Sequence, residues 1–80
     1  MDIRKQVGVN LQRLRREKGW SQEALAFESS LHRTYVSGIE RGVRNPTLLI
    51  LDKLAKTLGV RPTEFLADRT GSSRRGSPRV

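Results

Sequence analysis

Cysteine is absent from the 80 residues of this chain, and histidine occurs once, as His32. Without cysteine there can be no disulfide framework and no thiolate metal site, and one histidine cannot build a histidine-based metal centre. We therefore expect no metal and no other cofactor. No apolar run approaches the ~20 residues that a membrane-spanning helix needs, and no apolar leader follows Met1. These absences predict a cytoplasmic protein with no membrane partner.

Catalytic patterns are also missing. A chain of this length forms one domain, and so small a domain buries too little surface to enclose a deep cleft. The sequence shows no Ser–His–Asp set, no carboxylate pair, no metal-binding cluster and no glycine-rich loop that could cradle a phosphate. The chain is therefore not expected to be an enzyme.

Positive charge is present in excess, because 16 Lys and Arg stand against 8 Asp and Glu and give a net charge of +8. Six basic and two acidic residues in positions 1–20 give +4, six and five in positions 21–66 give +1, and four and one in positions 67–80 give +3. The excess therefore flanks the central part of the chain. By itself, this distribution fits either a protein that binds nucleic acid or a soluble surface followed by a basic tail.

Apolar residues at helical spacing predict an all-α fold of five helices. The first is expected at residues 2–18, the second from Ser21 to Ser29-Ser30, the third at about 32–41, the fourth from Thr47 to Gly59, and the fifth from Pro62 to Leu66. Ser21 and Thr47 are the expected N-caps of their helices, and glycines follow the first, third and fourth helices. The residues expected to face the core are Ile3, Val7, Leu11 and Leu14 of the first helix and Leu48, Leu51, Leu54, Ala55 and Leu58 of the fourth.

After Asp68 the sequence reads RTGSSRRGSPRV, with a single apolar residue. Such a composition cannot bury enough apolar surface to offset the entropy of ordering the chain. The expected organisation is an ordered domain at residues 1–67 and a disordered basic tail at residues 68–80.

The central sequence contains motifs of a known family. It reads SQEALA, then a short turn, then RTYVSGIERG, and finally NPTLLILDKLAKTLGV. This combination resembles the Cro/C1-type helix-turn-helix regulators over residues 8–66, and within them it is most similar to the controller proteins of restriction–modification systems. The resemblance implies a compact, lambda-repressor-like DNA-binding domain with a helix-turn-helix motif at about residues 22–41.

The resemblance also implies that residues 32–41 form the recognition helix. The second helix of such a motif lies in the major groove of DNA, and its exposed N-terminal residues touch base edges. Arg33 could pair bidentately with guanine O6 and N7, with a phosphate contact as the alternative. For Gly38, a close approach of the backbone to DNA and a packing role both remain open. The residues expected to read bases are Arg33, Thr34, Ser37 and Gly38.

Other residues are expected to contact the DNA backbone, with a solvated surface position as the alternative for each. Tyr35 either reaches the DNA or packs against the body. His32, where the family commonly has Ser or Asp, would bind a phosphate better when protonated. The residues expected to contact phosphate are Gln22, His32, Tyr35, Arg41, Arg44 and Asn45.

Two further features follow from the resemblance. Arg15 and Glu40 match positions that form a structural ion pair, so they are expected to support the scaffold and not to bind DNA directly. Ser30 stands where the turn usually has glycine, and a left-handed backbone conformation there would carry some strain.

The function expected from these residues is sequence-specific, transcription-regulating binding to double-stranded DNA. One small module buries little DNA, so we expect a homodimer on a near-palindromic operator, with regulation of its own gene as one mode of action. An activator would also contact RNA polymerase. The alternative is an antitoxin or another protein-interaction module on the same fold. The expected dimer surface consists of Leu49, Ile50, Phe65 and Leu66, with completion of the core as the alternative for Phe65 and Leu66.

Overall fold

The computed structural model describes residues 2–68, so the predicted tail lies outside the described residues except for Asp68. The elements are α1 (Ile3–Glu17), α2 (Gln22–Ser29), α3 (Arg33–Glu40), α4 (Leu48–Leu58) and the 3₁₀ helix η1 (Pro62–Leu66). The described part of the chain is thus entirely helical, but the fifth expected helix is a 3₁₀ helix. Short 3₁₀ segments of this length are common as connectors and at the ends of helical regions.

Local signals in the sequence set the ends of the helices. The Ser21 hydroxyl accepts a hydrogen bond from the amide of Ala24 at 3.0 Å, and the Thr47 hydroxyl accepts one from the amide of Ile50 at 3.1 Å. Both N-caps are therefore confirmed. The turn between α2 and α3 contains Ser30 at φ 59°, the one non-glycine residue in the left-handed region among those described. The strained turn expected at this position is confirmed.

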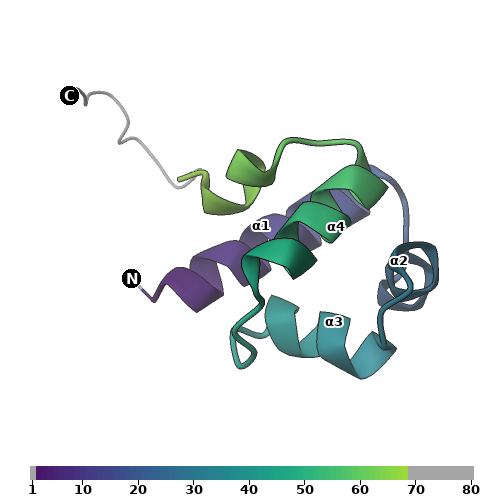
Figure 1. Ribbon diagram of the computed structural model, residues 1–80, viewed down its shortest axis with the longest axis horizontal. Coiled ribbons are helices and arrows are strands. Elements are labelled where there is room, and N and C mark those ends of the chain that lie inside the picture. Colours follow the sequence, from purple (N-terminus) through teal and green to yellow (C-terminus); the bar gives the residue numbers. More distant parts are fainter. Residues whose placement is uncertain (1, 69–80) are drawn as a thin grey trace.

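The helices surround one core, to which every element contributes. The buried apolar residues are Val7, Leu11, Leu14, Leu25, Ala26, Val36, Ile39, Leu54, Ala55, Leu58 and Phe65. α1 packs against α3 and η1, α2 packs against α3 and α4, and η1 also packs against α4. Figure 1 shows the result, in which α3 lies along one side of the molecule and η1 along the opposite side.

The close approach of α1 to α3 depends on a glycine. A Cβ at Gly8 would collide with the carbonyl oxygen of Ile39 and would lie 2.6 Å from that of Glu40. Both are backbone atoms at the end of α3 and cannot move aside as a flexible side chain could. Gly8 therefore lets α1 cross directly over the end of the expected recognition helix.

Two residues expected in the core are on the surface. Ile3 is 54% exposed because it lies in the first turn of α1, beyond the part of the helix that other elements cover. Leu48 is 83% exposed for the same reason at the start of α4. Ile50, which was expected on the surface, is instead half-buried and packs against the core.

Candidate nucleic-acid interface

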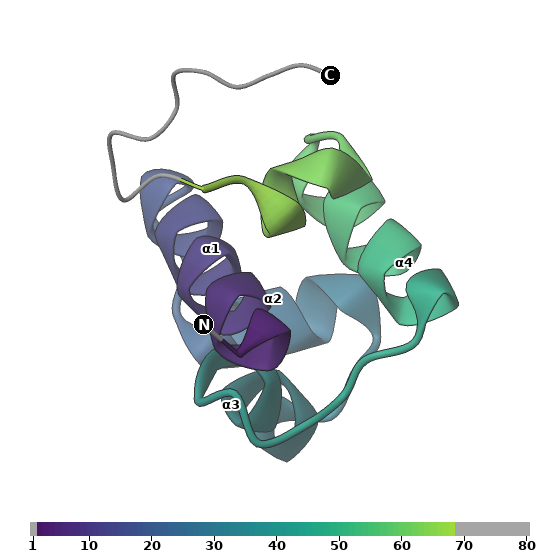
Figure 2. The ribbon, with the colours of Figure 1, turned by 90° about the vertical axis from the view of Figure 1, so that its left-hand side faces the viewer.

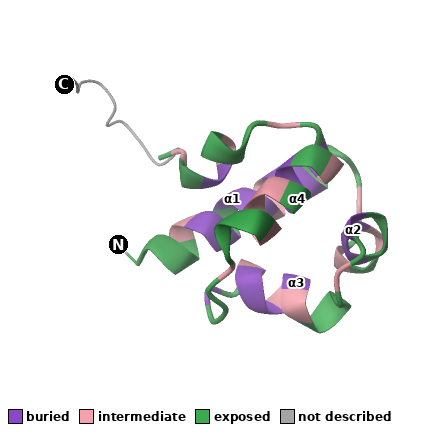
Figure 3. Cartoon of the chain, viewed as in Figure 1, coloured by how far each residue is buried: buried purple, intermediate pink, exposed green. Residues whose placement is uncertain are grey.

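α3 exposes its first turn to solvent and buries its apolar side against the rest of the domain. Arg33 and Thr34 in its first turn are exposed, whereas Val36 and Ile39 are fully buried. Figure 3 shows this contrast, with the exposed start of α3 beside α2 and the buried part farther along the helix. The chain therefore holds this short helix by its apolar side and leaves its first turn free for a ligand.

Exposed polar side chains lie close together at the start of α3. His32 is the N-cap residue, but its ring makes no capping hydrogen bond to the helix. The ring nitrogen Nδ1 lies 3.1 Å from the Thr34 hydroxyl. One turn later, the half-buried Ser37 hydroxyl accepts a hydrogen bond from Arg41 Nε at 3.4 Å. The residues expected to touch bases and phosphates here thus share one accessible surface, except for Gly38.

Gly38 is buried, so a contact between its backbone and a base stays a prediction and would require the Arg44 side chain to move. A Cβ at Gly38 would collide with Arg44 Cγ, because the aliphatic part of Arg44 covers this position. The guanidinium carbon of Arg44 lies 5.4 Å from the centre of the Tyr35 ring, within the range of a cation–π contact. The absence of a side chain at Gly38 therefore lets a loop arginine lie against α3.

The loop after α3 is folded back onto that helix. The amides of Val43 and Arg44 both donate to the carbonyl of Gly38, at 3.0 and 3.1 Å. Gly42 has φ +78°, a conformation that glycine adopts without strain. Arg41, Arg44 and Asn45 are all exposed. Figure 2 shows this loop passing from α3 to the start of α4.

A buried ion pair fixes α3 to α1, as expected. Arg15 Nε donates to Glu40 Oε2 at 2.7 Å, and Arg15 Nη2 donates to Glu40 Oε1 at 3.0 Å. The two side chains are only 9% and 2% exposed. The hydrogen bonds to the Glu40 carboxylate raise the pKa of Arg15 above its usual value, although burial opposes this, so Arg15 stays charged. The pair holds α3 against α1, and neither side chain is accessible at the surface.

Gln22 belongs to the same network. Its side-chain amide nitrogen donates to Glu40 Oε1 at 2.9 Å, and the residue is half-buried. A phosphate contact by Gln22 remains a prediction, and it would have to use the second N–H of that amide or the backbone N–H at the start of α2. This hydrogen bond could not be predicted from the sequence, because its partners are 18 positions apart.

The expected dimer surface is only partly exposed. Leu49 is 82% and Leu66 is 51% exposed, and each could meet a second copy of the chain. Phe65 is 0% exposed, so its assignment to this surface is wrong, because the ring completes the core between the helices. Leu48 and Ile3, which were not expected on the surface, add exposed apolar area.

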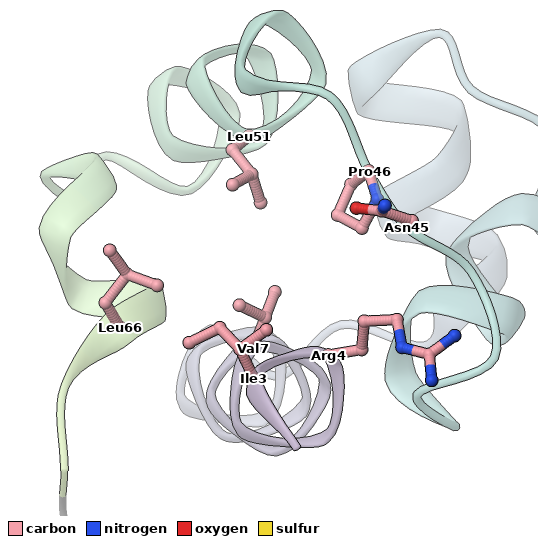
Figure 4. Close-up of a pocket in the computed structure, with 7 residues that line it drawn as sticks. All are labelled: Ile3, Arg4, Val7, Asn45, Pro46, Leu51 and Leu66. Atoms are coloured by element: carbon pink, nitrogen blue, oxygen red, sulfur yellow. The ribbon is translucent and has the colours of Figure 1, made fainter.

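A small pocket opens between the start of α1 and the start of α4. Its volume is about 110 Å³, and its lining is mainly apolar. Figure 4 shows that Ile3 and Val7 come from α1, Leu51 from α4 and Leu66 from η1. Arg4, Asn45 and Pro46 complete the rim. The pocket is too small to serve as a deep ligand site.

Residues 2–68 contain no helix that is long and apolar enough to cross a membrane. Within the same residues, no group of three or more histidine, aspartate or glutamate side chains is arranged to hold a metal ion.

Comparison with known proteins agrees with this geometry. The helix-turn-helix family model matches residues 11–65. An uncharacterized HTH-type transcriptional regulator (y4dJ) of Sinorhizobium fredii is 50% identical over 66 residues, which are 82% of this chain and 86% of that protein.

Two solved structures are also similar. The restriction–modification controller protein C.AhdI of Aeromonas hydrophila is 48% identical, with a TM-score of 0.75 over 78% of this chain and 94% of that one. The controller protein C.Esp1396I, solved as a tetramer with its natural 35 base-pair operator, is 42% identical, with a TM-score of 0.73 over 81% of this chain and 86% of that one. The chain therefore belongs to the helix-turn-helix family, together with transcriptional regulators and restriction–modification controller proteins.

Proposed function

We propose that this protein is a sequence-specific transcriptional regulator that binds operator DNA through α3. The observation that carries the proposal is the two-sided character of this helix, whose apolar side is buried while Arg33 and Thr34 in its first turn are exposed. The major groove admits one α-helix, and base edges there differ in their pattern of donors and acceptors. C.Esp1396I, a relative at 42% identity, has been solved on its operator.

In this proposal Arg33 reads a guanine, and Thr34 and Ser37 touch neighbouring bases or phosphates. Arg41, Arg44 and Asn45 bind the phosphate backbone beside the groove, and His32 and Tyr35 lie at its edge. Phosphate contacts fix the position of a protein on the duplex, whereas contacts with base edges select the sequence. A backbone contact by Gly38 would require the Arg44 side chain to move, since Arg44 covers it.

We further propose that the protein acts as a homodimer on a near-palindromic operator. Two-fold symmetry would place the two copies of α3 about 34 Å apart, one turn of the double helix. Leu48 and Leu49 support such an interface, because two adjacent large apolar side chains at the start of α4 are 83% and 82% exposed, and exposed apolar surface often marks a contact between proteins.

Fluorescence anisotropy with the DNA upstream of this protein's own gene tests the function. We expect an affinity about 10³-fold or more above that for scrambled DNA, with saturation at an even number of protomers per site. Such a result would support the proposal that the protein regulates its own gene. Equal affinity for both DNAs, with a steep salt dependence, would show that only the charge of the protein is recognised. A protein partner, as for an antitoxin, would then become the better explanation.

Replacing Leu49 with Asp is expected to convert the dimer into a folded monomer. The side chain is 82% exposed in the protomer, so the substitution leaves the core intact but puts a charge into the proposed interface. Sedimentation would measure the molecular mass, and circular dichroism would verify the helices. Phe27→Asp on α2 is the matched control, since Phe27 is also 82% exposed. If Leu49→Asp remains dimeric, the interface lies elsewhere.

A further inference from the structure

Two glycines near the end of α3 are covered by cationic side chains from other parts of the chain. Gly38 lies under the aliphatic part of Arg44, which belongs to the following loop. Gly42 lies under Lys5 of α1, since a Cβ at Gly42 would be 2.8 Å from Lys5 Cγ and 3.2 Å from Lys5 Cα. Arg44 and Lys5 can therefore occupy these positions only because residues 38 and 42 are glycines and carry no side chain.

Both cations lie against the C-terminal part of α3 and the turn that follows it, which we call the C-terminal flank of α3. Tyr35 and Gly38 are three residues apart on one side of α3, and Gly42 lies in the turn just after the helix ends at Glu40. Arg44 extends from Gly38 towards the Tyr35 ring, and Lys5 covers Gly42 at the other end. Figure 2 shows the first turns of α1 above α3 and its following loop, in agreement with the packing of α1 on α3.

Neither cation is neutralised by an ion pair within residues 2–68. The ion pairs of this region join Arg4–Asp2, Arg13–Glu17, Arg13–Glu64, Arg15–Glu40 and Lys56–Asp52. Asp2, the acid closest in sequence to Lys5, is held by Arg4 at 3.0 Å, and Lys5 acts on it only through its charge. Glu40 is 2% exposed and already bound by Arg15. Among residues 2–68, the flank therefore presents two exposed positive charges that form no ion pair with an acidic side chain.

We propose that Lys5 and Arg44 together bind the phosphate backbone of the DNA strand beside α3, with Lys5 as a contact that α1 contributes. This inference rests on the proposed function. When a helix lies in the major groove, the sugar–phosphate strands run along its flanks, so cations on one flank meet successive phosphates. Packing of the Lys5 stem on Gly42 limits its freedom, and less rotamer entropy is then lost on binding.

Lys5→Met tests the proposal, because methionine keeps an unbranched stem over Gly42 and removes the charge. We expect affinity for operator and scrambled DNA to fall by similar factors. The slope of log affinity against log salt should become shallower by about one per protomer. Lys5→Arg should restore the slope. Lys56→Met, which removes an equal charge from an exposed position on α4, should leave the slope unchanged.

A structural role and a phosphate-binding role of Lys5 predict different results for Lys5→Met. If Lys5 only stabilises the negative C-terminal end of α3, Lys5→Met lowers the melting temperature but keeps the salt slope of the unsubstituted protein, and the proposal is overturned. Equal slopes for Lys5→Met and Lys56→Met at unchanged melting temperature overturn it as well. Failure of the proposed function is distinguishable, because the unsubstituted protein would then not prefer its operator.

Discussion

Replacing Glu40 with Ala is expected to lower the free energy of unfolding by about 3–5 kcal/mol, the usual cost of leaving one partner of a buried pair uncompensated. The carboxylate accepts two hydrogen bonds from Arg15 and one from Gln22, and its side chain is 2% exposed. Its removal leaves the guanidinium of Arg15 without its counter-charge at a site where water has little access. Denaturation followed by circular dichroism would measure the loss.

Two further variants test whether the loss of stability comes from leaving one buried charge without its partner. Asp52→Ala breaks the exposed pair between Asp52 and Lys56, and we expect it to cost less than about 0.5 kcal/mol. The double variant Arg15→Met/Glu40→Leu removes both buried charges, and we expect it to be more stable than Glu40→Ala. If Glu40→Ala and Asp52→Ala cost the same, the Arg15–Glu40 pair does not hold α3 in place.

Replacing Arg33 with Ala is expected to lower operator affinity by about 10- to 100-fold, since a bidentate contact with guanine is worth ~1–3 kcal/mol. Affinity for scrambled DNA should change much less, because no base is recognised there. The fold should be unaffected, as Arg33 is exposed in the first turn of α3, where the positive end of the helix does not favour a cation.

Anisotropy titrations on both DNAs would measure the effect of Arg33→Ala, and Arg61→Ala is the matched control. Arg61 is exposed and precedes η1, on the opposite side of the molecule from α3 (Figure 1). The substitution Arg61→Ala removes the same charge without changing the proposed DNA interface. An equal loss of affinity for operator and scrambled DNA would make Arg33 a phosphate contact instead of a base reader.

The main features of the fold could be predicted from the sequence because they depend on near neighbours. The Ser21 and Thr47 caps each involve residues three positions apart, and the glycine turns after α1, α3 and α4 need only a local φ above zero. Whether the side chains of Leu48 and Ile50 face the core or the solvent could not be predicted. Four consecutive apolar residues at the start of α4 give no clear periodicity, and only the packing of α4 decides which of them faces inward.

In the candidate site, too, local features could be predicted from the sequence and contacts between distant residues could not. The sequence predicted the buried apolar side and the exposed first turn of α3 from helical spacing, whereas the role of a recognition helix was implied by the family resemblance and stays a proposal. The sequence left open whether Gly38 approaches DNA or serves packing, and only the tertiary structure revealed that Arg44 lies over this position. The sequence also gave no reason to connect Lys5 with Gly42 or Gln22 with Glu40. Such contacts depend on how helices cross, and here the crossing of α1 and α3 is permitted by the absence of a side chain at Gly8.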